Sequence, residues 1–239
     1  MNKWSFFAVL CCILLLCALP AMAQEEQTLP VITITYAAGA PLSPEEAVDA
    51  QVTIARDGQE HAFPARLRLN AAAMDSEERD LPQRSLYIEG ADMRFVLYND
   101  GGDALRTKLL STVCSGLVAQ CPVAVPVRTQ EPVEVYVNGD YRGLYSRRED
   151  IADAIARFEG LDSAAALNVA DVNTDAFCGD ASGIANALQQ LKALNLSLEA
   201  DRQTLSTLLD TESFLNWAAV SAFFGNLNMK SDVIFYQVG

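Results

Sequence analysis

The sequence has little positive charge and almost no histidine. Among its 239 residues, 17 lysines and arginines face 31 aspartates and glutamates, so the formal net charge is -14. Such a chain repels phosphate backbones, which argues against sequence-independent nucleic-acid binding. The single histidine, His61, leaves no basis for most zinc sites and histidine-based proton relays. Because His61 stands beside Glu60 in a polar stretch, we expect it to be an exposed loop residue.

Several catalytic motifs are also absent. The sequence has no P-loop, dinucleotide-binding glycine pattern, zinc-binding helix or nucleophile-elbow serine. Ser182, between Gly179 and Gly183, stands one place too late for such an elbow. The composition, with 51% hydrophobic and 20% charged residues, is typical of a globular protein with a buried core.

Residues 1–23 have the pattern of a secretory signal peptide. Lys3 precedes a long apolar run, and residues 21–23 (Ala-Met-Ala) match an A-x-A cleavage site. The alternative is an uncleaved membrane anchor, but the run is short for a span of about 20 residues and ends at Pro20. We therefore predict cleavage after Ala23, export of the mature chain and no stable membrane anchor.

An odd number of cysteines remains once the predicted signal peptide is removed. Six occur, and three of them lie within the signal: Cys11, Cys12 and Cys17. Of Cys114, Cys121 and Cys178, at most one pair can bridge. On one straight helix Cys114 and Cys121 would lie about 10 Å apart, beyond the limit of about 7 Å between Cα atoms, so a bridge requires the helix to end between them. The sequence allows two alternatives: a disulfide bridge between Cys114 and Cys121, or buried free thiols.

The first half of the mature chain is predicted to be rich in β-structure. Residues 24–48 form an extended segment in which Val31–Tyr36 alternates apolar residues with threonine and becomes an edge strand. Residues 49–148 form a β-rich lobe with strand candidates at 51–56, 65–70, 85–89 and 93–98. A following helix carries one apolar stripe that we expect to lie on the sheet: Leu105, Leu109, Val113 and Leu117.

A β-hairpin is the most strongly patterned element. Val133, Val135 and Val137 alternate with polar residues, which places them on one face of a strand. Asn138-Gly139 supplies the two positive-φ positions of a type I′ turn. The chain then returns as a second strand.

Residues 149–239 are predicted to form a helical lobe. Helices are indicated after Glu149 and over residues 180–194 and 198–209. Asp210 is placed to cap another helix, which we expect to be central to this half because of its apolar stripe of Phe214, Trp217 and Phe224. A strand at 233–236 ends the sequence, so we expect this lobe to be incomplete. The predicted fold class is α+β, with a β-rich N-terminal half and a helical C-terminal half.

The hairpin resembles the signature V-x-V-Y-x-N-G-x-Y-x-G-x-Y … E-x-I of the spore coat protein H (CotH) kinase-like family. The matching residues are Asn138, Gly139, Tyr141, Gly143, Tyr145, Glu149 and Ile151. Residues 94–106 are similar to the family's W-x-L … D … R-N segment and include Arg106. Residues 210–236 are similar to its D-x-x-S-F … G-N-x-D … Y segment and include Asn226.

The resemblance implies an atypical protein-kinase-like fold, with ATP between the two lobes and Mg²⁺ as the charge carrier. It also implies a serine or threonine of a coat or surface protein as the phosphate acceptor. Phosphoryl transfer needs cationic groups that contact the phosphates. It also needs carboxylates that hold the metal ion and one that accepts the proton of the attacking hydroxyl. The resemblance assigns Arg66 or Arg106 to phosphate and Glu149 to positioning of the metal–nucleotide complex.

Three departures from the family pattern fall on these charged groups. Ala65 and Arg66 replace two lysines. Asn228 stands where the family has aspartate, and an amide cannot take a proton, which leaves Asp232 as the substitute carboxylate. The family's later W-D-x-D metal carboxylates would lie beyond Gly239. We therefore expect a weak or inactive kinase, and the alternative is a non-catalytic binding or structural module of the cell surface or spore coat.

Overall fold

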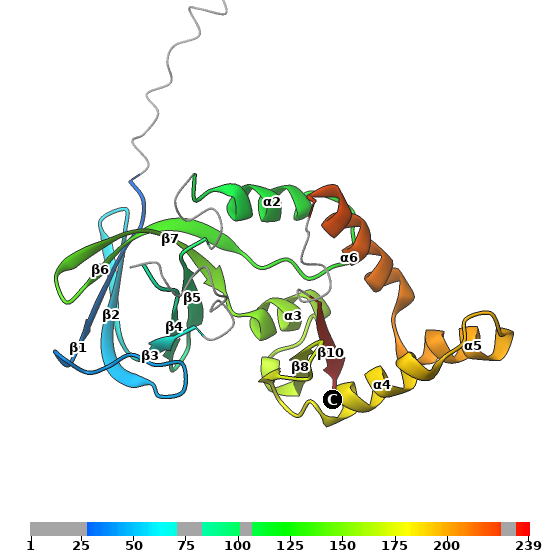
Figure 1. Ribbon diagram of the computed structural model, residues 1–239. Helices are drawn as coiled ribbons and strands as arrows, with labels where there is room; N and C mark the ends of the chain where they lie inside the picture. Colours follow the sequence, from blue (N-terminus) through cyan, green and yellow to red (C-terminus); the bar gives the residue numbers. More distant parts are fainter. Residues whose placement is uncertain (1–27, 71–82, 101–106, 226–232) are drawn as a thin grey trace, which may run out of the picture.

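The computed structural model describes residues 28–70, 83–100, 107–225 and 233–239. In these residues a closed β-barrel precedes a smaller, three-stranded sheet surrounded by helices (Figure 1). The predicted α+β class is therefore confirmed. The closure of the barrel and the second sheet were not predicted.

The barrel is built from strands of the first half of the chain. They are β1 (Val31–Tyr36), β2 (Val48–Arg56), β3 (Gln59–Leu69), β4 (Leu86–Gly90), β5 (Arg94–Tyr98), β6 (Gln130–Val137) and β7 (Asp140–Glu149). Their order is β1-β2-β3-β4-β5-β7-β6, and β1 pairs in parallel with β6 to close the ring. The prediction that β1 is an edge strand was wrong, because β2 and β6 hydrogen-bond to its two sides.

The barrel interior holds the main hydrophobic core. Alternate residues of each strand point inward, as the period of a β-strand requires. Val133, Val135 and Val137 are at most 6% exposed, which confirms their predicted common face. They pack with Ile32, Ile34, Val52, Leu67, Ile88, Phe95 and Leu97.

The hairpin turn also fastens the barrel. Asn138 and Gly139 have φ values of 51° and 88°, which confirms the two predicted positive-φ positions. The Asn138 Oδ1 atom accepts a hydrogen bond from the backbone N–H of Tyr36 at 2.9 Å, and the Asn138 N–H donates to the Ile34 carbonyl at 2.8 Å. The β6–β7 turn is therefore tied to β1.

His61 does not lie in a loop. Strand β3 begins at Gln59, so His61 is an exposed strand residue whose ring centroid lies 5.4 Å from that of Phe63. The predicted exposure is confirmed and the predicted loop is wrong. The long β2–β3 hairpin extends through this polar stretch because its backbone pairing continues to the Asp57-Gly58 turn.

The C-terminal part contains α3 (Ile151–Glu159), η4 (Ala164–Ala166), β8 (Leu167–Asp171), β9 (Ala176–Cys178), α4 (Ser182–Ala193), α5 (Glu199–Leu208), α6 (Thr211–Phe223) and β10 (Ile234–Val238). The strands pair antiparallel in the order β10-β8-β9. Sequence analysis missed β8 and β9, which are short and contain alanine, asparagine and aspartate, residues with low β-propensity. This part is therefore mixed rather than purely helical.

Helix α3 begins one residue later than the sequence suggests. Asp150, not Glu149, is the N-cap, and its Oδ1 atom accepts a hydrogen bond from the Ala152 N–H at 2.9 Å. Glu149 is the last residue of β7 and pairs with Phe95. The aspartate takes the cap position because its short side chain reaches the free N–H groups of the first turn.

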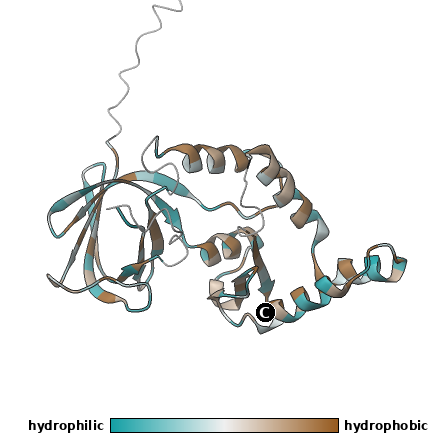
Figure 2. Ribbon diagram, viewed as in Figure 1, coloured by the Kyte–Doolittle hydropathy of each residue, from teal (hydrophilic) through white to brown (hydrophobic). Residues whose placement is uncertain are grey.

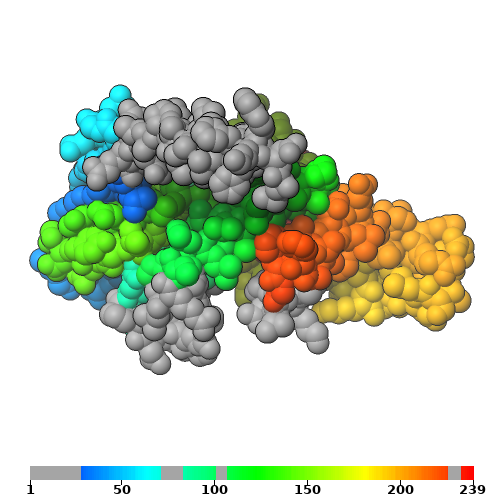
Figure 3. Space-filling model, turned by 90° about the horizontal axis from the view of Figure 1, so that it is seen from above, coloured from blue at the N-terminus to red at the C-terminus, as the bar shows by residue number. Residues whose placement is uncertain are grey.

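Helix α2 (Leu110–Val118) and helix α6 expose most of their apolar residues. In α2 and its N-cap, Leu109, Val113 and Leu117 are 47%, 53% and 49% exposed, so this part of the predicted stripe does not lie on the sheet. Leu105, the first residue of that stripe, lies outside the described residues. In α6, which was expected to be central, Ser221 is the buried residue and Phe223 is 81% exposed. Both helices are hydrophobic along their length (Figure 2), and α2 meets the C-terminal end of α6 at the surface (Figure 3).

The described residues contain three cysteines and no disulfide bond. Cys114, Cys121 and Cys178 are all free, although α2 ends at Val118 as a bridge would require. Cys121 is exposed and the other two are half-buried, so the alternative of buried free thiols holds only in part. Within the residues that the structure describes, no helix combines the length and apolarity needed to cross a membrane.

We predict that Asn138→Ala lowers the free energy of unfolding by about 2 to 3 kcal/mol. Alanine resists the left-handed backbone, and the bond to Tyr36 is lost. Asp57→Ala is the matched control, because Asp57 has the same φ of 51° in another hairpin and its side chain bonds no other described residue. That variant should lose about 1 kcal/mol in urea unfolding. Equal losses would show that the Tyr36 bond contributes nothing.

Candidate functional site

The hairpin residues that carry the family resemblance mainly shape and stabilise the barrel. Gly143 has a φ of 99° at a register shift, opposite Val135. Tyr141 is 53% exposed and packs its ring 5.1 Å from that of Tyr136. Tyr145 lies in the barrel core, where burial raises the pKa of its phenol to about 12. One tyrosine thus lies on the surface and the other in the core, so their side chains do not face a common space.

Arg66 is held on the outer surface of the barrel. Its Nη2 atom donates to the Ala47 carbonyl at 2.8 Å, and its Nε atom lies 3.5 Å from the Asp49 carboxylate. Both charged side chains are more than half exposed. Its neighbours Ala65 and Leu67 point into the barrel, so Arg66 must point outward. The predicted phosphate ligand is therefore a surface residue paired within its own hairpin.

The Glu149 carboxylate connects the end of the barrel to α3. It accepts hydrogen bonds from the Thr129 N–H and hydroxyl, each at 3.0 Å, and from Arg157 at 2.8 and 3.1 Å. Burial acts to raise the pKa of Glu149, but the bonds from Arg157 and Thr129 outweigh it and hold the pKa below its ordinary value. The carboxylate thus accepts four hydrogen bonds from protein donors, three on Oε2 and one on Oε1.

The other predicted site residues lie outside the described residues. These are Arg106, Asn226, Asn228 and Asp232. Their assignments remain predictions.

A polar cluster that sequence analysis missed lies where the barrel meets α3. Arg94 donates two hydrogen bonds to the Asp153 carboxylate, at 2.6 and 2.8 Å. Tyr87 donates to Asp150 at 3.2 Å, and its burial near that carboxylate raises the pKa of the phenol. The partners are about 60 positions apart, so no local pattern in the sequence could have indicated this cluster.

Arg128 is the cation of this junction with the fewest partners. Its Nε atom donates to the Glu149 carbonyl at 2.7 Å, and it makes no other hydrogen bond or ion pair among the described residues. Burial, together with the nearby Arg148 charge, lowers the pKa of Arg128 to about 10, which still leaves it charged at neutral pH. A half-buried guanidinium of this kind suits an anionic ligand better than Arg66 does.

The described residues do not form a metal site built from protein side chains alone. They contain no group of three histidine, cysteine, aspartate or glutamate side chains arranged around a common point. Asp100, which is buried, instead accepts hydrogen bonds from Ser146 at 2.8 Å and Ser111 at 2.9 Å. Because Mg²⁺ in phosphoryl-transfer sites is usually held by one or two carboxylates together with phosphate oxygens and water, the absence of such a group from the described residues concerns all-protein cages only.

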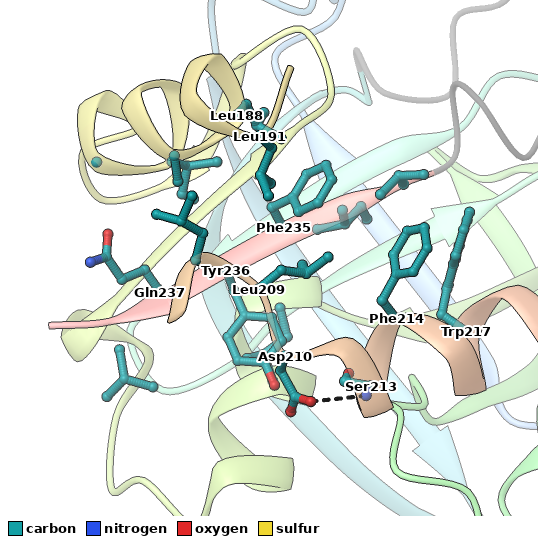
Figure 4. Close-up of a pocket in the computed structure, with 18 of the residues that line it drawn as sticks. Leu188, Leu191, Leu209, Asp210, Ser213, Phe214, Trp217, Phe235, Tyr236 and Gln237 are labelled. Atoms are coloured by element: carbon teal, nitrogen blue, oxygen red, sulfur yellow. Dashed lines mark hydrogen bonds between the residues drawn. The ribbon is translucent and has the colours of Figure 1, made fainter. Parts of the chain in front are cut away.

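A cavity of about 770 Å³ lies among α3, α4, α6 and β10 (Figure 4). Its walls are largely apolar and include Leu188, Leu191, Leu209, Phe214, Trp217 and Phe235. At one end the Tyr236 hydroxyl donates to Glu159 at 2.6 Å, beside Asp210, the N-cap of α6. No lysine, arginine or histidine is among the described residues that line it, so it does not suit the phosphates of a nucleotide.

We predict that Glu149→Gln reduces the loss of stability in acid. Because the folded-state pKa of Glu149 lies below the unfolded value, its contribution is present above the ordinary carboxyl pKa and is lost as the pH falls through the folded value. The free energy of unfolding should therefore fall less between pH 7 and about pH 3 in the variant than in the unaltered protein. The exposed Glu60, changed to Gln, is the control and should follow the unaltered protein. If Glu149→Gln and the unaltered protein show the same pH dependence of stability, the hydrogen bonds from Thr129 and Arg157 do not stabilise the ionised Glu149 carboxylate.

The comparison with protein families agrees with the hairpin signature. Residues 73–238 match the family model described as CotH kinase protein. A search of curated proteins found no match. Because the family match covers more than half of the chain, the protein belongs to the CotH kinase protein family.

Proposed function

We propose that this protein is an exported CotH-family member with a kinase-like architecture in which phosphoryl transfer from ATP to serine or threonine is weak or absent. The observation that carries the proposal is the set of hydrogen bonds that the Glu149 carboxylate accepts from the protein. Thr129 and Arg157 donate four hydrogen bonds to its carboxylate and tie it to the start of β6 and to α3. A residue that must hold the folded junction together is a poor choice for a group that orients a metal–nucleotide complex.

The remaining charged groups support the same proposal. Asn228 cannot act as a general base, and Arg66 is paired on the outer surface of the barrel. Arg128 is the described cation best suited to contact a phosphate of bound ATP, because its guanidinium has unused donors. Binding of ATP without efficient transfer is the expected combination.

Export rests on the signal-like residues 1–23. The acceptor of any residual transfer would be a serine or threonine of a coat or surface protein, as the family resemblance implies. Nucleic acid is not an expected partner of a chain with net charge -14.

A non-catalytic binding module is the second candidate function. Exposed apolar side chains on α2 and α6 favour it, because large apolar patches on soluble proteins often mark interaction surfaces. The most exposed are Leu110, Val113, Leu215 and Phe223.

We predict little or no phosphate transfer from labelled ATP by the purified mature chain, with Mg²⁺ or Mn²⁺ and an unstructured serine-rich acceptor. Loss of a general base costs roughly 10²- to 10⁴-fold in rate. Asn228→Asp restores a carboxylate, so a gain in transfer would show that the rest of the site is intact. Asn195→Asp adds the same charge in the exposed α4–α5 connection and should change nothing.

Asp232→Ala tests the remaining route to activity. Robust transfer by the unaltered chain that Asp232→Ala abolishes would overturn the proposal and identify Asp232 as the base. Absence of transfer in all variants, together with absence of ATP binding in calorimetry, would favour the binding module. Absence of transfer with ATP binding that Arg128→Gln weakens would support the inactive kinase-like protein.

A further inference from the structure

The cavity beside α6 is large enough for a small molecule, and its two charged lining residues, Glu159 and Asp210, lie at one end. Its volume of about 770 Å³ falls within the range of roughly 300 to 1,000 Å³ that is usual for small-molecule sites. Figure 4 shows Phe214 and Trp217 facing the space from α6, opposite Phe235 of β10. We propose that this cavity binds an organic cation with an apolar body, with its charged nitrogen between Glu159 and Asp210. This inference does not depend on phosphoryl transfer.

The apolar part of such a ligand has a defined surface to contact. The rings of Phe214 and Trp217 lie 5.5 Å apart with an angle of 34° between their planes, and together they form one side of the cavity. Aromatic faces attract alkylammonium groups as well as hydrocarbon. Leu209 and Leu191 continue the apolar wall.

The two carboxylates have oxygen atoms to spare. Asp210 Oδ1 accepts the capping bonds from the N–H groups of Glu212 and Ser213, at 3.0 and 3.1 Å, and Asp210 Oδ2 accepts none from a described residue. Glu159 Oε1 accepts the Tyr236 hydroxyl, and Glu159 Oε2 has no partner among the described residues. Tyr236 lies between these two groups: its hydroxyl donates to Glu159, and Figure 4 shows Asp210 beside its ring.

The lining selects against other ligand charges. The described lining residues carry two carboxylates and no cation, so an anion would be repelled from the cavity. A neutral ligand gains the apolar contact but no attraction to the two carboxylates, which lie at the exposed end of the cavity. A cation gains both, and the net charge of -14 on the whole chain also attracts it.

Trp217 makes this proposal directly measurable. The sequence has two tryptophans, Trp4 and Trp217, and Trp4 lies within residues 1–23. In a chain that begins at Gln24, the tryptophan fluorescence, excited selectively over that of the tyrosines, therefore comes from the cavity alone. Hexyltrimethylammonium, 1-hexanol and hexanesulfonate are suitable probes, since they share the apolar tail and differ in head-group charge.

The proposal predicts saturable binding of hexyltrimethylammonium at low salt, with hexanol at least about tenfold weaker and hexanesulfonate weaker still. Glu159→Gln and Asp210→Asn should each weaken binding of the cation about fivefold and leave hexanol unchanged. Asparagine also caps helices well, so Asp210→Asn preserves α6. Glu212→Gln removes a charge from the same helix turn outside the cavity lining and should have no effect.

Three results would overturn the inference: equal affinity for the three probes, cation binding that neither carboxylate variant weakens, or no saturable change in Trp217 fluorescence. Unchanged hexanol binding in the variants shows that the cavity is still folded, so loss of cation affinity cannot be attributed to misfolding.

Discussion

The parallel pairing of β1 with β6 is the contact on which the rest of the barrel depends. It joins residues about 100 positions apart and converts a meander of antiparallel strands into a ring without free edges. Asn138 reinforces it from the β6–β7 turn by accepting the Tyr36 N–H. The same residue supplies the left-handed backbone of the turn and the bond to β1. An asparagine at this position therefore has a structural explanation that does not involve a ligand.

The charged residues at the end of the barrel connect it to α3. Glu149 binds Thr129 and Arg157, and Arg94 binds Asp153. These bonds span the point where β7 ends and α3 begins. Arg128 lies in this network with unused donors, which makes it the described residue best placed to contact an anion. Glu149, one of the residues that carry the family resemblance, thus stabilises this junction.

Local patterns in the sequence predicted the hairpin, its turn, the cap at Asp210 and most barrel strands. Each of these depends on neighbouring residues, such as alternation in a strand or an oxygen placed to bond the next N–H groups. Barrel closure, the β10-β8-β9 sheet and the Arg94–Asp153 pair join distant segments, and alternation does not specify a partner. The sequence indicated apolar residues on α2 and α6, but an apolar pattern does not show whether anything covers it, and in both helices these side chains are largely exposed. In the candidate site, Arg66 and Glu149 were named from the family resemblance. Only the structure shows that Arg66 is bonded to Ala47 and that Glu149 is bonded to Thr129 and Arg157.

The central claim is that Glu149 stabilises the fold rather than holding a ligand. A double-mutant cycle between Glu149→Gln and Arg157→Gln tests it most directly, with the free energy of unfolding and the affinity for ATP measured on all four proteins. We predict a coupling energy of about 1 kcal/mol in stability and no effect of Glu149→Gln on ATP affinity. Additive effects on stability, together with a clear loss of ATP affinity in Glu149→Gln, would contradict the account.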